Sequence, residues 1–292
     1  MKTILSVILI TLILTGCNFS RSVKKDLISG LTTTGKDLTC DDVYITVNGE
    51  RTTRKSFIYG EVFYLNLSDV KGFTKENGNV FPGMKMHIVS QAGDTVFQSG
   101  DLYSGYSEGM NYSPLLLTAD LTIADPIKSK DNYTQIVNVW DKKGKGKFTS
   151  KFDFKVVEND QIILESSGVS HDEIYLFSQG MNTVITDSRI DFDDNIYIIA
   201  EGLKGFNEEN GLVFPGLSLK ATDSGNNQIF NYDDLFADYT STGIEASDFA
   251  GRVSSHFKIT GTVFNNPLHC QMIIWDKKSD ARITITTDMV LK

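Results

Sequence analysis

The sequence predicts an all-β protein made of two tandem antiparallel β-sandwich domains of the immunoglobulin-like type. Two observations predict this fold: the second half of the chain repeats the first, and within each half apolar and polar residues alternate over short runs. A period of two is the pattern of a strand with one buried face. Such a sheet needs a second sheet to cover its apolar face. A jelly roll or another sandwich topology fits the same pattern.

The repeat is clearest in one loop. The stretch KGFTKENGNVFPGMKM begins at Lys71, and KGFNEENGLVFPGLSL begins at Lys204. Around the loop VFYLNL matches NIYIIA, and VNVWDKK matches MIIWDKK. A tandem duplication of one domain explains these matches. We therefore predict copy one over residues 37–157 and copy two over residues 158–292, with the boundary at the ENDQ segment.

The predicted strands are marked by apolar residues at every second position, and matching positions are apolar in both copies. About seven strands per copy are expected, as in immunoglobulin-like sandwiches, although the Cys and Trp spacing of antibody domains is absent. Representative core positions are Phe63, Leu65, Leu67, Met84, Met86, Ile88, Leu117, Leu121, Phe148 and Phe154 in copy one, and Ile196, Ile198, Ala200, Leu217, Leu219, Ala221, Val253, Phe257, Ile283 and Met289 in copy two.

Packing, rather than binding, is the expected reason for the repeated loop. Its Asn-Gly dipeptides suit a tight turn because both residues tolerate positive φ. Apolar and polar residues of the loop are kept together, whereas a binding loop would keep chiefly its polar ones. Four phenylalanines are expected to close the sandwich ends: Phe73, Phe81, Phe206 and Phe214. A binding loop used twice is the alternative.

A targeting segment precedes the repeat. A basic start and an apolar run lead to Leu14-Thr15-Gly16-Cys17. This tetrapeptide resembles the lipobox of bacterial lipoproteins, in which the chain is cut before the cysteine and the thiol then carries a diacylglycerol. The resemblance implies a signal peptide over residues 1–16, lipidation of Cys17, and a spacer within residues 17–36. An ordinary secretory signal with an incidental cysteine is the alternative.

The same resemblance implies a location. The protein would be held at a bilayer of the bacterial cell envelope, by our prediction the outer membrane, through the palmitate-type chains on Cys17. The periplasmic and surface faces both remain open. The apolar run is too short to cross a hydrocarbon core of about 30 Å at ~1.5 Å per residue. We therefore expect a tethered protein whose lipid partner is the bilayer.

Composition narrows the possible partners. The formal net charge is −9 and the sequence pI is about 5.0. A nucleic-acid partner is therefore not expected, because phosphate recognition relies on an excess of basic residues. Hydrophobic residues make up 40% of the chain, which is enough for sizeable cores and argues against disorder.

Two groups of residues are candidate ligand sites. Strand alternation places Trp140 and Trp275 away from the core, where an indole can stack on a sugar ring; coverage by a neighbouring loop is the alternative. An acidic run gathers Asp187, Asp191, Asp193 and Asp194, which could supply oxygen ligands to Ca²⁺ in copy two only. No EF-hand spacing is present, so solvated loops are the alternative reading.

Catalytic motifs are absent from the sequence. There is no nucleophile elbow, Walker loop or dinucleotide fingerprint. Apart from Cys17 the cysteines are Cys40 and Cys270, which we expect to be separate buried thiols, with a bridge between them as the alternative. Asp101 and Asp234, and the DKK segments after each Trp, are expected to form turns.

These observations predict a non-enzymatic, lipid-anchored envelope protein that acts as a binding or assembly module for a protein or glycan partner. The alternative is a sugar-binding accessory or a hydrolase of a polysaccharide-utilisation system. Trp and Asp side chains that converge in one groove would favour the alternative, and buried Trp side chains would weaken it.

Overall fold

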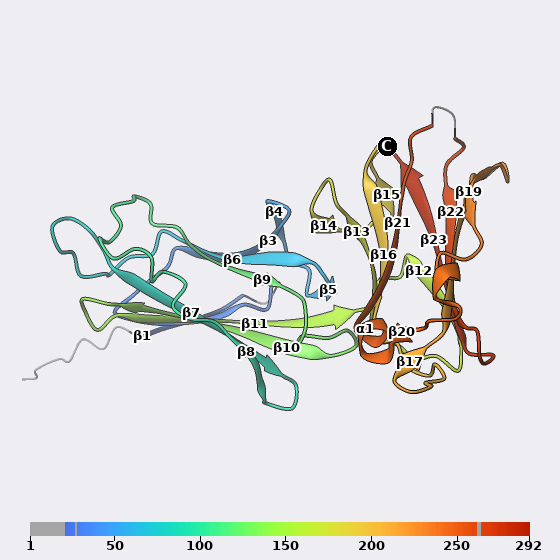
Figure 1. Cartoon of the computed structure of the whole chain (residues 1–292). Helices are drawn as coiled ribbons and strands as arrows, with labels where there is room; N and C mark the ends of the chain where they lie inside the picture. Colours follow the sequence, from blue (N-terminus) through green and yellow to red (C-terminus); the bar gives the residue numbers. More distant parts are fainter. Residues whose placement is uncertain (1–20, 27, 262–263) are drawn as a thin grey trace, which may run out of the picture.

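The computed structural model describes residues 21–26, 28–261 and 264–292, and almost all of its regular structure is β (Figure 1). Within these residues the helical elements are the short α1 (Ala246–Gly251) and the 3-10 turn η1 (Ala237–Tyr239). The prediction of an all-β chain of antiparallel sandwich sheets is confirmed. No helix in this part of the chain has the length and apolarity needed to cross a membrane.

The strands up to residue 157 form two sheets. One has the order β1-β2-β11-β10-β7-β8, with β5 beside β11, and the other has the order β4-β3-β6-β9. The strands are β1 (Arg21–Lys25), β2 (Thr32–Lys36), β3 (Asp42–Val47), β4 (Glu50–Thr52), β5 (Ser56–Ile58), β6 (Val62–Ser68), β7 (Pro82–Ser90), β8 (Thr95–Gln98), β9 (Leu117–Thr122), β10 (Asn132–Asp141) and β11 (Lys147–Val157).

The strands after residue 157 repeat this arrangement. One sheet has the order β12-β23-β22-β18-β19, with β15 beside β23, and another has the order β14-β13-β16-β21. The strands are β12 (Ile162–Ser167), β13 (Glu173–Ser178), β14 (Thr183–Val184), β15 (Arg189–Ile190), β16 (Asn195–Glu201), β17 (Leu212–Val213), β18 (Pro215–Thr222), β19 (Gln228–Tyr232), β20 (Ile244–Glu245), β21 (Arg252–Lys258), β22 (Leu268–Asp276) and β23 (Arg282–Leu291).

The crossings between sheets give both copies an immunoglobulin-like topology. The chain leaves one sheet after β6 for β7, returns for β9, and leaves again for β10. Copy two makes the same crossings at β16 to β18, at β21 and at β22. In each copy a short strand pairs in parallel with the last strand, β5 with β11 and β15 with β23, whereas the main pairings are antiparallel. The shared order of strands agrees with a duplication.

Each copy has its own cluster of buried apolar side chains, one within residues 31–156 and the other within residues 169–289. In copy one the cluster contains stacked and edge-on rings of Phe57, Phe63, Phe152 and Phe154. Copy two has isoleucine, leucine and methionine at its centre instead. Cys40 and Cys270 are buried free thiols, as the reading of separate thiols predicts.

Part of the predicted spacer is β-structure instead. Strand β2 pairs with β11 along its edge, and β1 pairs with β2 as a hairpin. Leu31, just before β2, is only 2% exposed and belongs to the copy-one core. The added strand covers an edge of β11 that would otherwise leave its N–H and C=O groups unpaired. Strand β12 does the same for β23 in copy two.

The two copies meet through a polar junction beside the ENDQ segment, which lies between β11 and β12. The Tyr59 hydroxyl donates to the Glu201 carboxylate at 3.1 Å, and its ring lies 5.3 Å from that of Tyr175. The Ser129 N–H and hydroxyl donate to Glu173 at 2.7 and 2.6 Å. Whether the two copies fold as independent domains remains a prediction.

Candidate binding site at the repeated loop

The glycine of each KGF segment lies against the backbone of an earlier segment. Gly72 has φ +98°, and a Cβ there would lie 2.1 Å from the Asp37 carbonyl oxygen; Gly205 has φ +102° and would meet the Gly168 oxygen at 2.0 Å. Both the positive φ and the close approach require glycine. This explains why the glycine of the KGF segment occurs in both copies.

The Asn-Gly dipeptides form the predicted turns. Asn77 and Gly78 have φ of 52° and 84°, and Asn210 and Gly211 have φ of 55° and 83°. Consecutive positive φ values are those of a type I′ hairpin turn. The prediction from these dipeptides is therefore confirmed.

The aspartate that follows each Trp holds the repeated loop in place. Asp141 is 5% exposed and accepts a hydrogen bond from the Thr74 N–H at 2.7 Å. Asp276 is 2% exposed and accepts the matching bond from the Asn207 N–H at 2.8 Å. The DKK segments thus do more than turn the chain, because each anchors the KGF loop to the end of a central strand.

The lysines of these segments cover the phenylalanine of the FPG stretch. The Lys143 ammonium lies 4.7 Å from the Phe81 ring centroid and pairs with Glu76 at 2.6 Å. Phe214 is buried at 8% exposure, whereas the other three predicted plugs are half-buried. The corresponding copy-two distances are 4.1 Å from Lys278 to the Phe214 ring and 2.8 Å from Lys278 to Glu209.

A second pair of aspartates links the loop region to β7 and β18. Asp101 accepts a hydrogen bond from the Met84 N–H at 3.0 Å and pairs with Lys142 at 2.7 Å. Asp234 pairs with Lys277 at 2.8 Å in the same way. These turn aspartates therefore also bind the first lysine of each DKK segment, which their sequence positions did not reveal.

The tryptophans are half-buried and lie in different copies, so they do not form one platform. Each indole lies across the glycine of its FPG stretch, where an added Cβ at Gly83 or Gly216 would come within 2.1 Å of the ring. Trp275 also lines an open cavity of about 310 Å³ together with Asp280 and Arg282. The indoles thus pack on the loop end of each sandwich, and Trp275 remains partly accessible.

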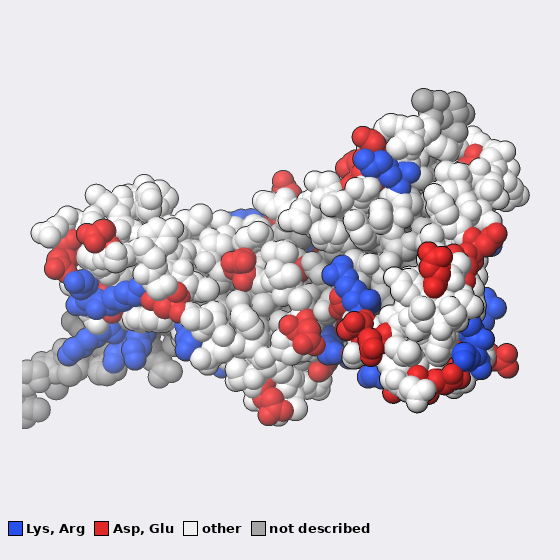
Figure 2. All heavy atoms as spheres, viewed as in Figure 1, with Lys and Arg blue, Asp and Glu red and all other residues white. Residues whose placement is uncertain are grey.

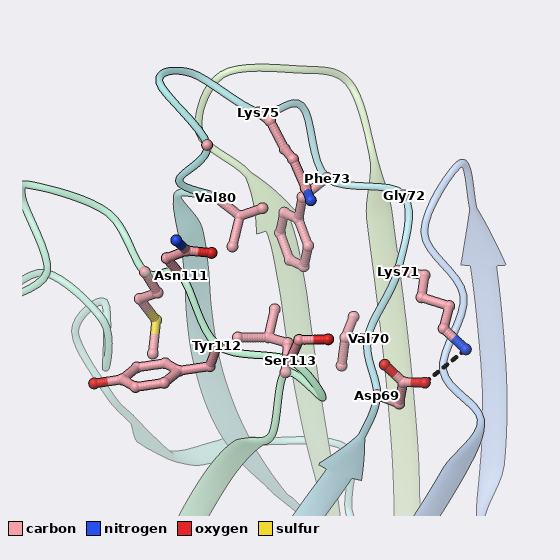
Figure 3. Close-up of a pocket in the computed structure, with 13 residues that line it drawn as sticks. Asp69, Val70, Lys71, Gly72, Phe73, Lys75, Val80, Asn111, Tyr112 and Ser113 are labelled. Atoms are coloured by element: carbon pink, nitrogen blue, oxygen red, sulfur yellow. Dashed lines mark ion pairs between the residues drawn. The ribbon is translucent and has the colours of Figure 1, made fainter.

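The candidate binding site is a cavity of about 260 Å³ in copy one, beside the repeated loop (Figure 3). Its apolar wall contains buried Val70, Val80, Met110 and Leu115. The half-buried Phe73 ring points into the cavity between Val80 and Val70. This cavity is referred to below as the Phe73 pocket.

Polar side chains surround the mouth of the Phe73 pocket. Lys75, Asn111 and Ser113 are exposed around it. Lys71 donates to Asp41 at 2.8 Å and pairs with Asp69 at 2.6 Å, and these contacts raise the pKa of its ammonium group. Lys71 is therefore charged at neutral pH. An apolar floor with a few polar groups at the rim is the usual composition of a binding pocket.

Copy two fills the matching place with its own side chain. The bridge between Val80 and Met110 corresponds to the pairing of Val213 with Ile244. After Ile244 the chain forms α1, whose Phe249 is 3% exposed. Its ring meets the Phe206 ring at 4.6 Å in an edge-on contact.

The connection in copy one is shorter and does not cover the pocket. Residues 111–116 join Met110 to β9 without regular structure, whereas residues 245–251 include α1 and join Ile244 to the matching strand β21. Phe73 has no ring partner among the described residues, and Tyr112, which lines the pocket at 65% exposure, turns its ring away from Phe73 (Figure 3). The Phe73 pocket is therefore the place that Phe249 closes in copy two.

Sequence reasoning did not find this pocket. It compared the positions that match, and the pocket results from a stretch that does not match, NYSPLL against EASDFAGR. A local mismatch inside an otherwise faithful repeat was the available signal.

The acidic run of copy two does not gather its carboxylates into one site. Among the described residues there is no group of three or more His, Cys, Asp or Glu side chains placed to hold a metal ion. Each aspartate has a separate partner: Asp187 with Arg189 at 2.6 Å, Asp191 with Lys292 at 3.6 Å, Asp193 with Lys258 at 3.3 Å, and Asp194 with the Gly180 N–H at 2.7 Å. Cys17, the predicted lipidation site, lies outside the described residues.

No protein-family model and no curated protein matches the chain. Solved structures resemble it only weakly. The protein titled pT26-6p is 8% identical, with 89% of this chain and 63% of that one covered and a TM-score of 0.28. The C-terminal domain of the Streptococcus agalactiae AgI/II polypeptide BspA is 10% identical, with 85% of this chain and 100% of that one covered and a TM-score of 0.24.

A calcium-binding mutant of Bacteroides uniformis β-glucuronidase 2 is 8% identical, with 86% of this chain and 32% of that one covered and a TM-score of 0.22. The chain spans less than two thirds of two of these three proteins. At TM-scores this low the resemblances support no inference about function, and the fold assignment rests on the order of the chain's own strands.

Proposed function

We propose that this chain is a lipid-anchored, non-enzymatic binding module of the bacterial cell envelope, and that the Phe73 pocket takes an apolar side chain of a protein partner. The observation that supports this proposal is the internal comparison. Copy two covers the half-buried Phe206 with its own Phe249, whereas Phe73 in copy one faces an open cavity. An aromatic ring donated by a partner would complete copy one as Phe249 completes copy two.

The lining of the Phe73 pocket suits a protein side chain better than a reacting substrate. Contact between an incoming ring and the Phe73 and Met110 side chains removes apolar area from water, at roughly 25 cal/mol per Å². No carboxylate, histidine or thiol faces the apolar wall of the pocket among its lining residues except Asp69, which pairs with Lys71. Binding, not catalysis, is what this lining supports.

The test is capture of partners from detergent-solubilised envelope, with the acylated protein as bait. Asn111→Trp places a bulky ring at the rim and should abolish capture, while Asn231→Trp, which makes the same change at an exposed position of β19 in copy two, is the matched control and should retain it. Equal capture by both variants would refute a role for the pocket.

The anchor is tested separately. Cys17→Ala should move the protein from the membrane fraction to the soluble fraction, or leave it as an uncleaved precursor, because acyl chains supply the stable attachment. A processed variant that still sediments with membranes after a high-salt wash would contradict the anchor.

A sugar-binding role is the second candidate, and the cavity beside Trp275 favours it. The half-buried Trp275 lines this cavity together with Asp280 and Arg282. Aromatic stacking combined with charged hydrogen-bonding groups is typical of sugar recognition. Quenching of Trp275 fluorescence by oligosaccharides, absent in Trp275→Phe, would support this candidate.

A further inference from the structure

The outer side of the large copy-one sheet carries an unusual set of charges. In β11 the phenylalanines at 148, 152 and 154 point into the core, so Lys147, Lys151 and Lys155 point outward. Directly paired residues of antiparallel strands share a face. Thr32 of β2 lies opposite both Lys25 of β1 and Lys151 of β11, so Lys25 is on the same side of the sheet as Lys151. Asn138 of β10 lies opposite both Lys85 of β7 and Thr149 of β11, so Lys85 is on this side as well. These five lysines are named the basic face.

The charge of the basic face is not neutralised by neighbours. Lys85 is half-buried and the other four are exposed. None of the five forms an ion pair within the described part of the chain. Asp153 is the one carboxylate that these strands place on the same side, and it accepts a hydrogen bond from the Thr134 hydroxyl at 2.7 Å. The net charge of this surface is therefore strongly positive in a chain whose formal net charge is −9.

The matching side of copy two is balanced. There the outward positions of β12, β18 and β23 hold Lys220 and Arg282, together with Glu165 and Asp288. His269 contacts Asp288 at 2.6 Å. Both sheets share one topology, so the fold does not require the positive charge of copy one. It is a property of that copy's surface alone.

The chain enters copy one at the edge strand β1, beside the basic face. In the strand register, Arg21 at the start of β1 lies opposite Lys36 of β2, and Lys36 lies opposite Lys147 of β11. Figure 2 shows Lys and Arg spheres gathered at this end of copy one, where β1 begins. Cys17 precedes Arg21 by four residues, a reach of at most about 14 Å for an extended chain. A lipid on Cys17 would hold this end of the sheet close to the bilayer surface.

We infer that the basic face binds the anionic lipid headgroups of the membrane. Each lysine near an anionic leaflet strengthens binding about five-fold. Trp140 lies directly opposite Lys147 on the same side of the sheet, and tryptophan favours the membrane interface. The tether makes this contact intramolecular, so even weak attraction orients copy one against the bilayer. The inference extends the proposed anchoring from a point of attachment to an oriented surface.

The test uses the chain that starts at Asn18, which contains every described residue and cannot be acylated, so it does not depend on the anchor. Flotation with phosphatidylcholine vesicles containing about one third phosphatidylglycerol should show binding that is lost at high salt and absent with pure phosphatidylcholine. Lys147→Glu/Lys151→Glu should weaken the partition coefficient roughly 25-fold or more. The control Lys220→Glu/Arg282→Glu makes the same change of charge on copy two and should bind as the parent does.

Three results would overturn the inference. The first is equal binding to charged and neutral vesicles, and the second is an equal loss in both double variants. The third is no vesicle binding by a protein that instead binds a soluble polyuronate through Lys147 and Lys151, which would identify an acidic glycan as the ligand. Melting curves of both double variants establish that each remains folded.

Discussion

Copy one and copy two share a scaffold and differ in what they leave exposed. Both hold the KGF loop by a buried aspartate, and both cover the FPG phenylalanine with a lysine. Copy two then closes its loop end with Phe249, whereas copy one leaves the Phe73 pocket open. Copy two also balances the charges of its large sheet, while copy one presents the basic face.

This difference separates structural requirement from function. Residues that occur in both copies satisfy backbone groups or fill close contacts, as Gly72 and Gly205 do. These shared residues explain why the loop sequence occurs in both copies, and they argue against a binding loop that is used twice. Features present in one copy only are not required by the fold. They are accordingly where a binding role is to be sought.

The largest effect is expected from removing copy one, which tests whether copy two folds by itself. Residues 158–292 should give a β circular dichroism spectrum and a cooperative thermal transition, because their apolar cluster is their own. The fragment loses only the junction, including the Ser129 contacts to Glu173. A non-cooperative trace would mean that the copies depend on one core.

Phe214→Ala tests whether the shared loop is kept for packing. Because Phe214 is buried beneath Lys278, its truncation should lower the free energy of unfolding by about 3 to 5 kcal/mol in chemical denaturation. Glu209→Ala is the control in the same loop. It removes an exposed ion pair with Lys278 and should cost well under about 1 kcal/mol. An unchanged denaturation midpoint for Phe214→Ala would contradict the packing explanation and favour a binding role for the loop.

A smaller effect is expected at the junction. Burial raises the pKa of the Glu173 carboxyl above its ordinary value of 4.5, despite the hydrogen bonds from Ser129; Lys128 lowers this pKa and Glu201 raises it. The folded state therefore holds the proton more tightly than the unfolded state. Stability should fall as pH rises from about 4.5 through the raised pKa, by about 1.4 kcal/mol for each unit of the shift.

Glu173→Gln should remove this pH-dependent loss, because the amide does not ionise. Urea denaturation of the parent and of this variant across pH 4 to 8 checks the prediction. Parallel stability profiles would show that Glu173 does not titrate differently in the folded chain.

Much of the fold could be predicted from the sequence, because two matching copies reveal which positions alternate together. Phe63, Leu65 and Leu67 are all fully buried in β6, as the alternation predicts. The hairpin of β1 and β2 was not predicted, since its Ser, Thr, Gly and Lys residues resemble a linker. Its place is set by long-range pairing with β11, which local pattern does not encode.

The candidate site was less predictable for the same physical reason. Trp140 faces away from the core as predicted, yet its contact with Gly83 depends on strand register. The Phe73 pocket depends on the path of residues 111–116, a segment without periodicity. The predicted Ca²⁺ ligands are adjacent in sequence, but Asp187 and Asp194 contact different partners in space.

The central claim is that copy one offers an open place for an aromatic ring and copy two does not. The most direct measurement is a titration of the chain with N-acetylphenylalaninamide, followed by the methyl signals of Met110 and Ile244 in NMR spectra. The account predicts that the Met110 signal shifts to saturation in the parent and not in Asn111→Trp, while the Ile244 signal shifts only in Phe249→Ala, which opens the matching cavity. A parent whose Met110 signal stays unchanged, or whose Ile244 signal moves equally, would contradict the account.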